Sequence, residues 1–131
     1  DFYKPAAHHF EIGKQLLELR KKGVLIIGSG NMIHNLGMIQ FPKNGDFNQN
    51  FGFDWAIEIN EIMKSKILDR DFEALVQYQK LHKDIALAVP SPDHYYPMIY
   101  TLGLAQKNEN IEIFNDSLVA GSLNMTSFKI G

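Results

Sequence analysis

The sequence contains no cysteine, so a disulfide framework and a thiolate metal site are both excluded. Any metal would have to be held by histidine, aspartate or glutamate, which favours zinc or non-haem iron over iron–sulfur or copper–thiolate centres. The sequence also lacks any apolar run close to the roughly 18 residues of a membrane-spanning helix, and it begins without the basic and apolar segments of a signal peptide. We therefore expect a cytoplasmic protein with no membrane partner.

An excess of charge of either sign is also absent. The 131 residues include 13 basic and 15 acidic side chains, which give a net charge of −2, and the longest basic run is Lys21-Lys22. A nucleic-acid surface needs clustered basic residues, so no nucleic-acid partner is expected. The hydrophobic content of 45% and the charged content of 21% are ordinary for a globular domain. The length is that of one domain or of part of a larger one.

Two long helices are predicted, over residues 5–22 and over about residues 54–69. The first begins with a proline and ends with lysines followed by Gly23, which are typical helix start and stop signals. The second carries an apolar stripe at helical spacing that consists of Trp55, Ile59, Ile62 and Met63. Alternating apolar residues predict short strands over residues 111–114 and 124–130.

Residues 24–34 combine a short apolar run, a glycine turn and a histidine. The run from Val24 to Ile27 predicts a buried strand over residues 24–28, and Gly28-Ser29-Gly30-Asn31 ends it before His34. In open α/β sheets, ligands bind at the carboxyl ends of strands and in the loops that follow them. A glycine turn alone is weak evidence, because most turns of this kind only reverse the chain.

A second histidine follows a predicted helix start. Ser91, Pro92 and Asp93 have the residue types of an N-cap and a first turn, which places His94 in the first turn of a helix that Pro97 is expected to kink slightly. The positive end of the helix dipole disfavours an imidazolium ion. A neutral His94 would be free to bind a metal.

Two histidines do not make a metal site, because a catalytic zinc or iron centre needs about three protein ligands and an open position. Asp93 and Asn31 are the nearby residues that could contribute further ligands. The remaining histidines are interpreted as structural: His82 lies in a polar surface stretch, and His9 is the better candidate for a packed position on the first helix. From spacing alone, both a metal site and a purely structural role remain open for the His34 and His94 pair.

Four segments occur in the order found in one known family. They are residues 4–13, 28–36, 90–97 and 121–131, and they include the motifs Ser-Gly-Asn-x-x-His-Asn-Leu and Pro-x-His-Tyr-x-Pro. The sequence therefore resembles the class III extradiol ring-cleavage dioxygenases, and within them the DOPA 4,5-dioxygenase-like branch. The resemblance covers essentially the whole chain.

The resemblance implies an α/β fold with a mixed sheet flanked by helices, and a mononuclear non-haem metal, Fe(II) or Zn(II). It also implies that a catechol such as DOPA is opened next to its hydroxyl groups with O₂. His94 falls on a metal ligand of the family. His34 falls on a histidine that is either a further ligand or the acid/base that acts on the catechol hydroxyls and bound oxygen. Asn31 and Asn35 are expected to orient these rings from behind.

The sequence departs from the family pattern in one respect. The family's other two metal histidines lie in a His-Gly-Ser-Pro motif and a Ser-Ala-His motif, and neither motif occurs in residues 1–131. We therefore expect residues 1–131 to be the C-terminal part of a single catalytic domain, with the N-terminal half as its partner and with little or no activity on their own. The alternative is a non-catalytic interaction protein on the same fold, because some relatives of this fold have lost oxygenase chemistry.

Overall fold

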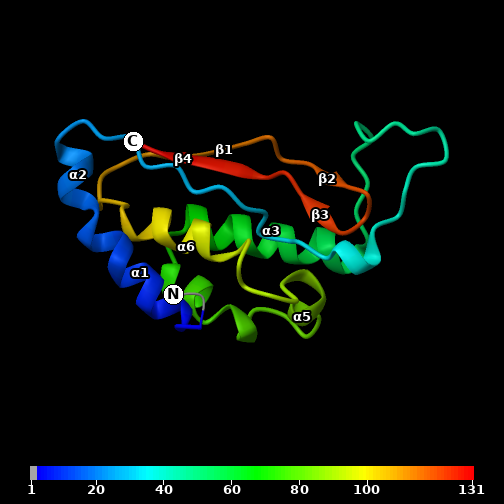
Figure 1. Ribbon diagram of the computed structural model, residues 1–131, viewed down its shortest axis with the longest axis horizontal. Coiled ribbons are helices and arrows are strands. Elements are labelled where there is room, and N and C mark those ends of the chain that lie inside the picture. Colours follow the sequence, from blue (N-terminus) through cyan, green and yellow to red (C-terminus); the bar gives the residue numbers. More distant parts are fainter. Residues whose placement is uncertain (1–2) are drawn as a thin grey trace.

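The computed structural model describes residues 3–131 (Figure 1). Its helices are α1 (Ala6–Gln15), α2 (Leu17–Lys21), α3 (Asp54–Leu68), α4 (Phe72–Val76), α5 (Ile85–Ala88) and α6 (Tyr96–Gly103), with short 3-10 turns η1 (Leu36–Met38) and η2 (Tyr78–Lys80). Its strands are β1 (Ile111–Phe114), β2 (Leu118–Val119), β3 (Leu123–Asn124) and β4 (Ser127–Ile130). In this part of the chain, no helix has the length and apolar character needed to cross a membrane.

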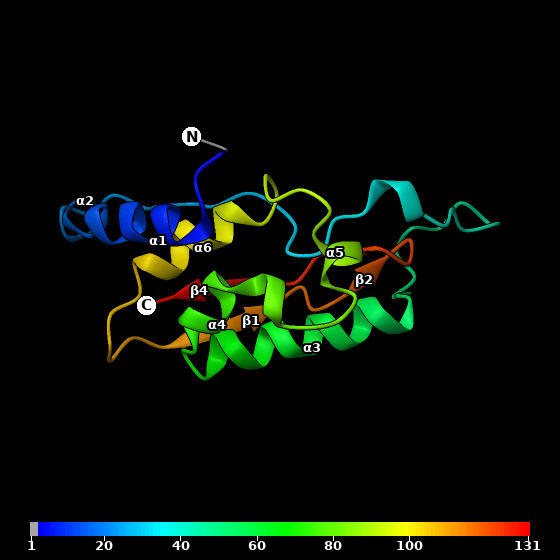
Figure 2. The same cartoon turned by 90° about the horizontal axis from the view of Figure 1, so that it is seen from below.

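The strands form two small antiparallel pairs, β1 with β4 and β2 with β3. The β1–β4 pair runs along α3, and α1 and α6 lie side by side (Figures 1 and 2). The α/β class is confirmed. The predicted mixed sheet is not, because within residues 3–131 the parallel pairing is limited to a single bridge between Gly52 and Gly121.

The core is built around α3, as its apolar periodicity predicts. Ile59 and Met63 are fully buried, whereas Trp55 and Ile62 lie at the edge of the stripe and stay half-buried. Ala56 and Ile67 complete the buried face at helical spacing, and they pack with fully buried residues from other elements, which include Leu75, Tyr95, Ile99 and Leu102.

Helix α1 packs closely on α6 through a glycine and a buried histidine. A Cβ added at Gly13 would lie 2.3 Å from the Tyr100 carbonyl oxygen, so only glycine permits this approach of the two helix backbones. His9 is buried, with Nδ1 2.6 Å from the Tyr100 hydroxyl and Nε2 3.1 Å from the Lys4 carbonyl oxygen. Burial lowers the pKa of this imidazole. The prediction that His9 is packed is confirmed.

The predicted helix over residues 5–22 is divided at Leu16, and it ends as expected at Gly23, whose φ of +83° favours glycine. The strand predicted over residues 124–130 is also divided, into β3 and β4. The two pieces pair with different strands, β3 with β2 and β4 with β1, and between them the Thr126 hydroxyl donates a 2.8 Å hydrogen bond to the Asn60 side-chain oxygen in the interior.

The strand predicted over residues 24–28 is wrong for this chain. The backbone groups of Leu25–Met32 make no hydrogen bond with any residue in the range 3–131, and the side chains of Leu25 and Ile27 are 80% and 77% exposed. A β-strand exists only through hydrogen bonds to a neighbouring strand. The apolar run has the composition of a buried strand, but this chain does not provide its partner.

A half-buried ion pair connects α2 to the loop before β1. The two guanidinium nitrogens of Arg20 lie 2.8 and 2.7 Å from the carboxylate oxygens of Glu109, and Arg20 also donates to the Leu104 and Ile130 carbonyl oxygens. The hydrogen bond from Arg20 is the main reason that the pKa of Glu109 lies below its ordinary value of 4.5. A bidentate pair of this kind is the strong form of an arginine–carboxylate contact.

Because its folded-state pKa is depressed, the Glu109 carboxylate stabilises the fold above about pH 4.5, and this contribution disappears as the pH falls through the folded-state pKa. In Glu109→Gln, we expect a lower free energy of unfolding at pH 7 and a shallower loss of stability between neutral and acid pH. Urea unfolding at several pH values measures both effects. Glu112→Gln, at an exposed pair with Lys129, is the control, and equal pH profiles for the two variants would contradict the prediction.

Candidate functional site

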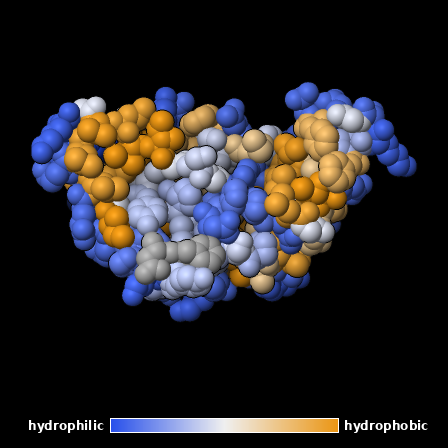
Figure 3. Space-filling view, viewed as in Figure 1, coloured by the Kyte–Doolittle hydropathy of each residue, from blue (hydrophilic) through white to orange (hydrophobic). Residues whose placement is uncertain are grey.

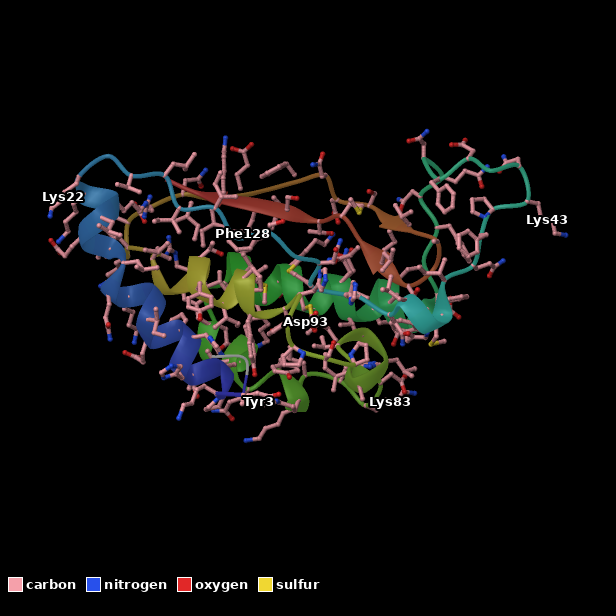
Figure 4. All side chains as sticks on the ribbon, viewed as in Figure 1. Tyr3, Lys22, Lys43, Lys83, Asp93 and Phe128 are labelled. Carbon is pink, nitrogen blue, oxygen red and sulfur yellow. The ribbon has the colours of Figure 1, made fainter. Side chains whose placement is uncertain are left out.

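The structure brings His34 and His94 together, although 60 residues separate them in the chain. Their rings are stacked, with centroids 3.8 Å apart and an angle of 6° between the ring planes. Asp93 lies beside them, with a carboxylate oxygen 3.7 Å from His94 Nε2, and it is labelled near the centre of the molecule in Figure 4. The pairing that the two motifs predicted is therefore present.

Backbone hydrogen bonds on both sides hold His34 in place. The His34 N–H donates to the Ala88 carbonyl oxygen over 2.8 Å, and His34 forms an isolated antiparallel bridge with Leu123. The next residue, Asn35, donates its N–H to Ser122, and the Ser122 hydroxyl donates back to the Asn35 carbonyl oxygen. The segment that carries His34 is thus fixed between α5 and β3.

A turn that precedes α6 positions His94. The N–H groups of Tyr95 and Tyr96 both donate to the Pro92 carbonyl oxygen, and α6 begins only at Tyr96. The fully buried Tyr95 anchors this turn, because its hydroxyl donates to the Leu75 carbonyl oxygen over 2.9 Å. The N-cap predicted at Ser91 is therefore wrong by four residues, because the N-cap of α6 is Tyr95, and His94 lies just before the helix instead of in its first turn.

Two details of the predicted helix start change accordingly. The Ser91 hydroxyl donates to the Asp93 carboxylate instead of capping a helix, and this bond is the main cause that lowers the pKa of Asp93. Pro97 stands in the first turn of α6, where a missing N–H costs no hydrogen bond, so it does not kink the helix.

The glycines of the Gly-Ser-Gly-Asn turn allow close packing against the segment that carries His94. A Cβ added at Gly30 would lie 2.3 Å from the His94 carbonyl oxygen, and one at Gly28 would lie 2.5 Å from the Pro97 carbonyl oxygen. Any larger residue would separate the two segments. The turn therefore serves the juxtaposition of the two histidines.

The side chains of Asn31 and Asn35 bond to backbone carbonyl groups. The Asn31 amide donates to the carbonyl oxygen of Asn124 over 2.5 Å, and the Asn35 amide donates to that of Leu87 over 2.8 Å. These contacts hold the chain on both sides of His34. A direct orienting contact from either amide to an imidazole ring stays a prediction.

A buried polar network behind His34 was missed by the sequence analysis. The side-chain oxygen of Asn124 accepts the Ile33 N–H over 2.9 Å, and its amide donates to the side-chain oxygen of Asn60 over 3.1 Å. Asn60 in turn donates to Asp116, which also receives an ion pair from Lys64. The available signal was Asn60, a polar residue next to Ile59 on the buried face of α3.

Removing this network should destabilise the site. In Asn124→Ala, the buried Ile33 N–H loses its partner and the Asn60 side-chain oxygen loses one of its two donors, and we expect a loss of about 1–3 kcal/mol in the free energy of unfolding. Chemical denaturation measures this loss. The matched control is Asn48→Ala in an exposed loop, where we expect a change within about 0.5 kcal/mol. A similar, small loss in both variants would show that the network does not support the structure.

Both rings carry a buried, unsatisfied nitrogen. Nδ1 of His34 and Nδ1 of His94 are inaccessible to solvent and have no hydrogen-bond partner within residues 3–131. Burial is the largest influence on His34 and, with the neighbouring His94, it lowers the pKa of the His34 imidazole, while Asp93 acts in the opposite direction. Buried nitrogens normally have partners, so these atoms point to contacts that the described residues do not make.

The stacked geometry limits how this pair can hold a metal. The lone pair of an imidazole nitrogen lies in the ring plane, and two nearly parallel stacked rings do not direct their lone pairs at one ion. The described residues also contain no group of three or more His, Asp or Glu side chains with metal-binding geometry. In this arrangement, one of the two histidines can bind a given ion, but both histidines cannot bind the same ion.

Comparisons with known proteins give a consistent result. The chain is 37% identical to the 4,5-DOPA dioxygenase extradiol of Escherichia coli K12 over its whole length, and it is 30–31% identical to those of Beta vulgaris and Mirabilis jalapa over 92–93% of its length. No family model matches. The chain spans about half the length of these curated relatives, with 43–47% of each relative covered.

The fold is shared as well. The crystal structure of an uncharacterised protein from Escherichia coli K12 superimposes on the whole chain with a TM-score of 0.88 at 35% sequence identity. The superposition covers 52% of that protein. Sequence and structure therefore agree that this chain corresponds to about half of a longer fold.

Proposed function

We propose that this chain, which belongs to the class III extradiol ring-cleavage dioxygenases of the DOPA 4,5-dioxygenase-like branch, is the C-terminal half of an enzyme that opens a catechol ring with O₂. The substrate would be a small catechol such as DOPA, consistent with the names of the relatives. The observation that supports a catalytic role most directly is the stacked pair of His34 and His94, each with an unsatisfied buried nitrogen.

We propose that His94 is a ligand of one mononuclear metal, Fe(II) or Zn(II), and that residues outside this chain complete the site. Such a metal would supply the electrophilic and redox chemistry by which a catechol and O₂ react. His94 lies in a turn anchored by the fully buried Tyr95, which is the kind of support a metal ligand requires.

We assign His34 to acid/base catalysis toward the catechol hydroxyls. The stacked geometry favours this role over the alternative of a second ligand to the same ion, because both ring planes cannot contain that ion. A half-buried imidazole that is neutral near pH 7 can accept a hydroxyl proton and return it later in the reaction. The hydrogen bonds around His34 fix its position relative to His94.

Oxygen uptake by the full-length protein tests this function. The protein is loaded anaerobically with Fe(II) and mixed with L-DOPA, and we expect consumption of one O₂ per catechol together with the absorbance of a ring-opened product. Tyrosine, which lacks the second hydroxyl group, is the control and should not be consumed. A metal-loaded protein that consumes no O₂ with any simple catechol would contradict the enzyme and favour the non-catalytic interaction protein.

A further inference from the structure

An open groove lies between the extended segment of residues 24–30 and strand β4. The groove has a volume of about 670 Å³. Residues 23–28 form one wall, residues 126–130 form the other, and Met98 and Thr101 of α6 lie along the floor with Leu104, which follows the helix. A hydrophobic area of the surface is visible over this region in Figure 3.

Both walls of the groove have a backbone edge that is not paired with a neighbouring strand among the described residues. Leu25–Met32 have no backbone hydrogen bond with any described residue. Strand β4 pairs with β1 on one edge, and β1 contributes only Phe114 to the groove, so the other edge of β4 borders it. Unpaired strand edges of this kind are templates for another strand.

Residues 25–30 also have the two-faced character of a strand. Gly28 and Gly30 pack against the backbone at and before the start of α6, whereas Leu25 and Ile27 point the other way and are 80% and 77% exposed. Side chains that alternate between two faces are the signature of β-structure. Apolar side chains on the outer face of such a strand are normally covered.

The two walls run in opposite directions. In Figures 1 and 2 the segment leaves α2 and runs away from it, whereas β4 runs back to end near α2. A strand placed between them would be parallel to one wall and antiparallel to the other. The result would be a mixed sheet, which is the arrangement that the described strands by themselves do not form.

We propose that this groove receives a β-strand from the half of the full-length protein that this chain does not span, and that the strand pairs with residues 25–30 and with β4 at once. The occupant follows from length, because the chain covers 47% of its Escherichia coli relative and 52% of the structure that it matches. The inserted strand carries apolar side chains toward the α6 floor, and its backbone supplies the partners that both walls lack. This inference does not depend on the dioxygenase activity.

Hydrogen exchange of the full-length protein tests the proposal. We expect the amides of residues 25–30 to exchange at least about 100-fold more slowly in the full-length protein than in the 131-residue chain, together with the amides on the free edge of β4. Slow exchange of the α3 amides in both proteins is the internal reference. Fast exchange at either wall in the full-length protein overturns the proposal, and so does concentration-dependent protection in the 131-residue chain, which would identify a second copy as the occupant.

A matched pair of variants tests whether the outer face of the segment is covered. Ile27→Lys should increase the unfolding equilibrium constant of the full-length protein at least tenfold, because the full-length protein buries the new charge. In the 131-residue chain, where Ile27 is exposed, the increase should be less than threefold. Phe41→Lys, at a side chain that is 72% exposed in a different apolar area, should have effects that do not differ between the two proteins. Equal effects of Ile27→Lys in both proteins would contradict burial of this face. Neither measurement uses turnover, so a failed oxygen-uptake assay leaves the result interpretable.

Discussion

His94→Gln in the full-length protein is expected to abolish most metal binding, whereas His34→Gln is expected to keep the metal and lose about 10²–10⁴-fold in kcat. The difference follows from the stacked rings, whose planes are 6° from parallel and do not share a point at which one ion could meet both lone pairs. One imidazole binds the ion, and the other acts on the proton of the substrate. Metal content by elemental analysis and initial rates of oxygen uptake separate the two effects.

His82→Gln is the matched control for these variants. His82 Nε2 lies 3.2 Å from a carboxylate oxygen of Glu58, and His82 Nδ1 accepts the Asp84 N–H, so its role is structural and separate from the stacked pair. We expect its metal content and kcat to stay close to those of the unmodified protein. Equal loss of metal in His34→Gln and His94→Gln would contradict the assignment and would require the rings to rotate out of the stack when metal binds.

The 131-residue chain alone is expected to turn over a catechol more than about 100-fold more slowly than the full-length protein, even with Fe(II) present. The physical reason is the number of ligands. A catalytic metal site needs about three protein ligands, and residues 3–131 contain no cluster of three suitable side chains. Loss of one residue that only supports a metal ligand typically lowers metal affinity or activity by about 10–100-fold. Loss of ligands that bind the ion directly should lower activity by more, and the estimate of more than about 100-fold follows from this.

Oxygen uptake at saturating Fe(II), compared at equal concentrations of the two proteins, measures this difference. The chain with His94→Gln serves as the background control, because it lacks the proposed ligand. If the 131-residue chain matches the full-length rate, the metal site is complete within these residues and the half-site proposal is wrong. If added Fe(II) restores turnover only at high concentration, weak metal binding accounts for the loss.

Local sequence patterns predicted the elements that depend on their own residues. The apolar spacing in residues 54–69 predicted α3, because a helix satisfies its backbone internally and needs only one apolar face to pack. The positive φ of Gly23 and the packed His9 also follow from residue type and position. The two motifs around His34 and His94 indicated the family and the candidate site residues, whose roles stay a prediction.

Other features required the tertiary structure, because they depend on residues far away in the chain. The run Val24 to Ile27 has the composition of a strand, yet strand formation requires a partner, and residues 3–131 provide none. The N-cap of α6 is Tyr95 instead of the predicted Ser91, and the buried Tyr95 is tied to α4 through the Leu75 carbonyl oxygen. No local pattern encodes that contact.

The sequence alone determined that two histidines stand in specific motifs and that the family's other ligand motifs are not in these residues. Only the tertiary structure decided how the two rings face each other, which separates the proposed ligand from the proposed acid/base. It also showed that Asn124 and Asn60 support His34 from the interior. The reason is physical: residue types set local conformation and chemistry, whereas ring geometry and buried hydrogen bonds arise from the packing of distant segments.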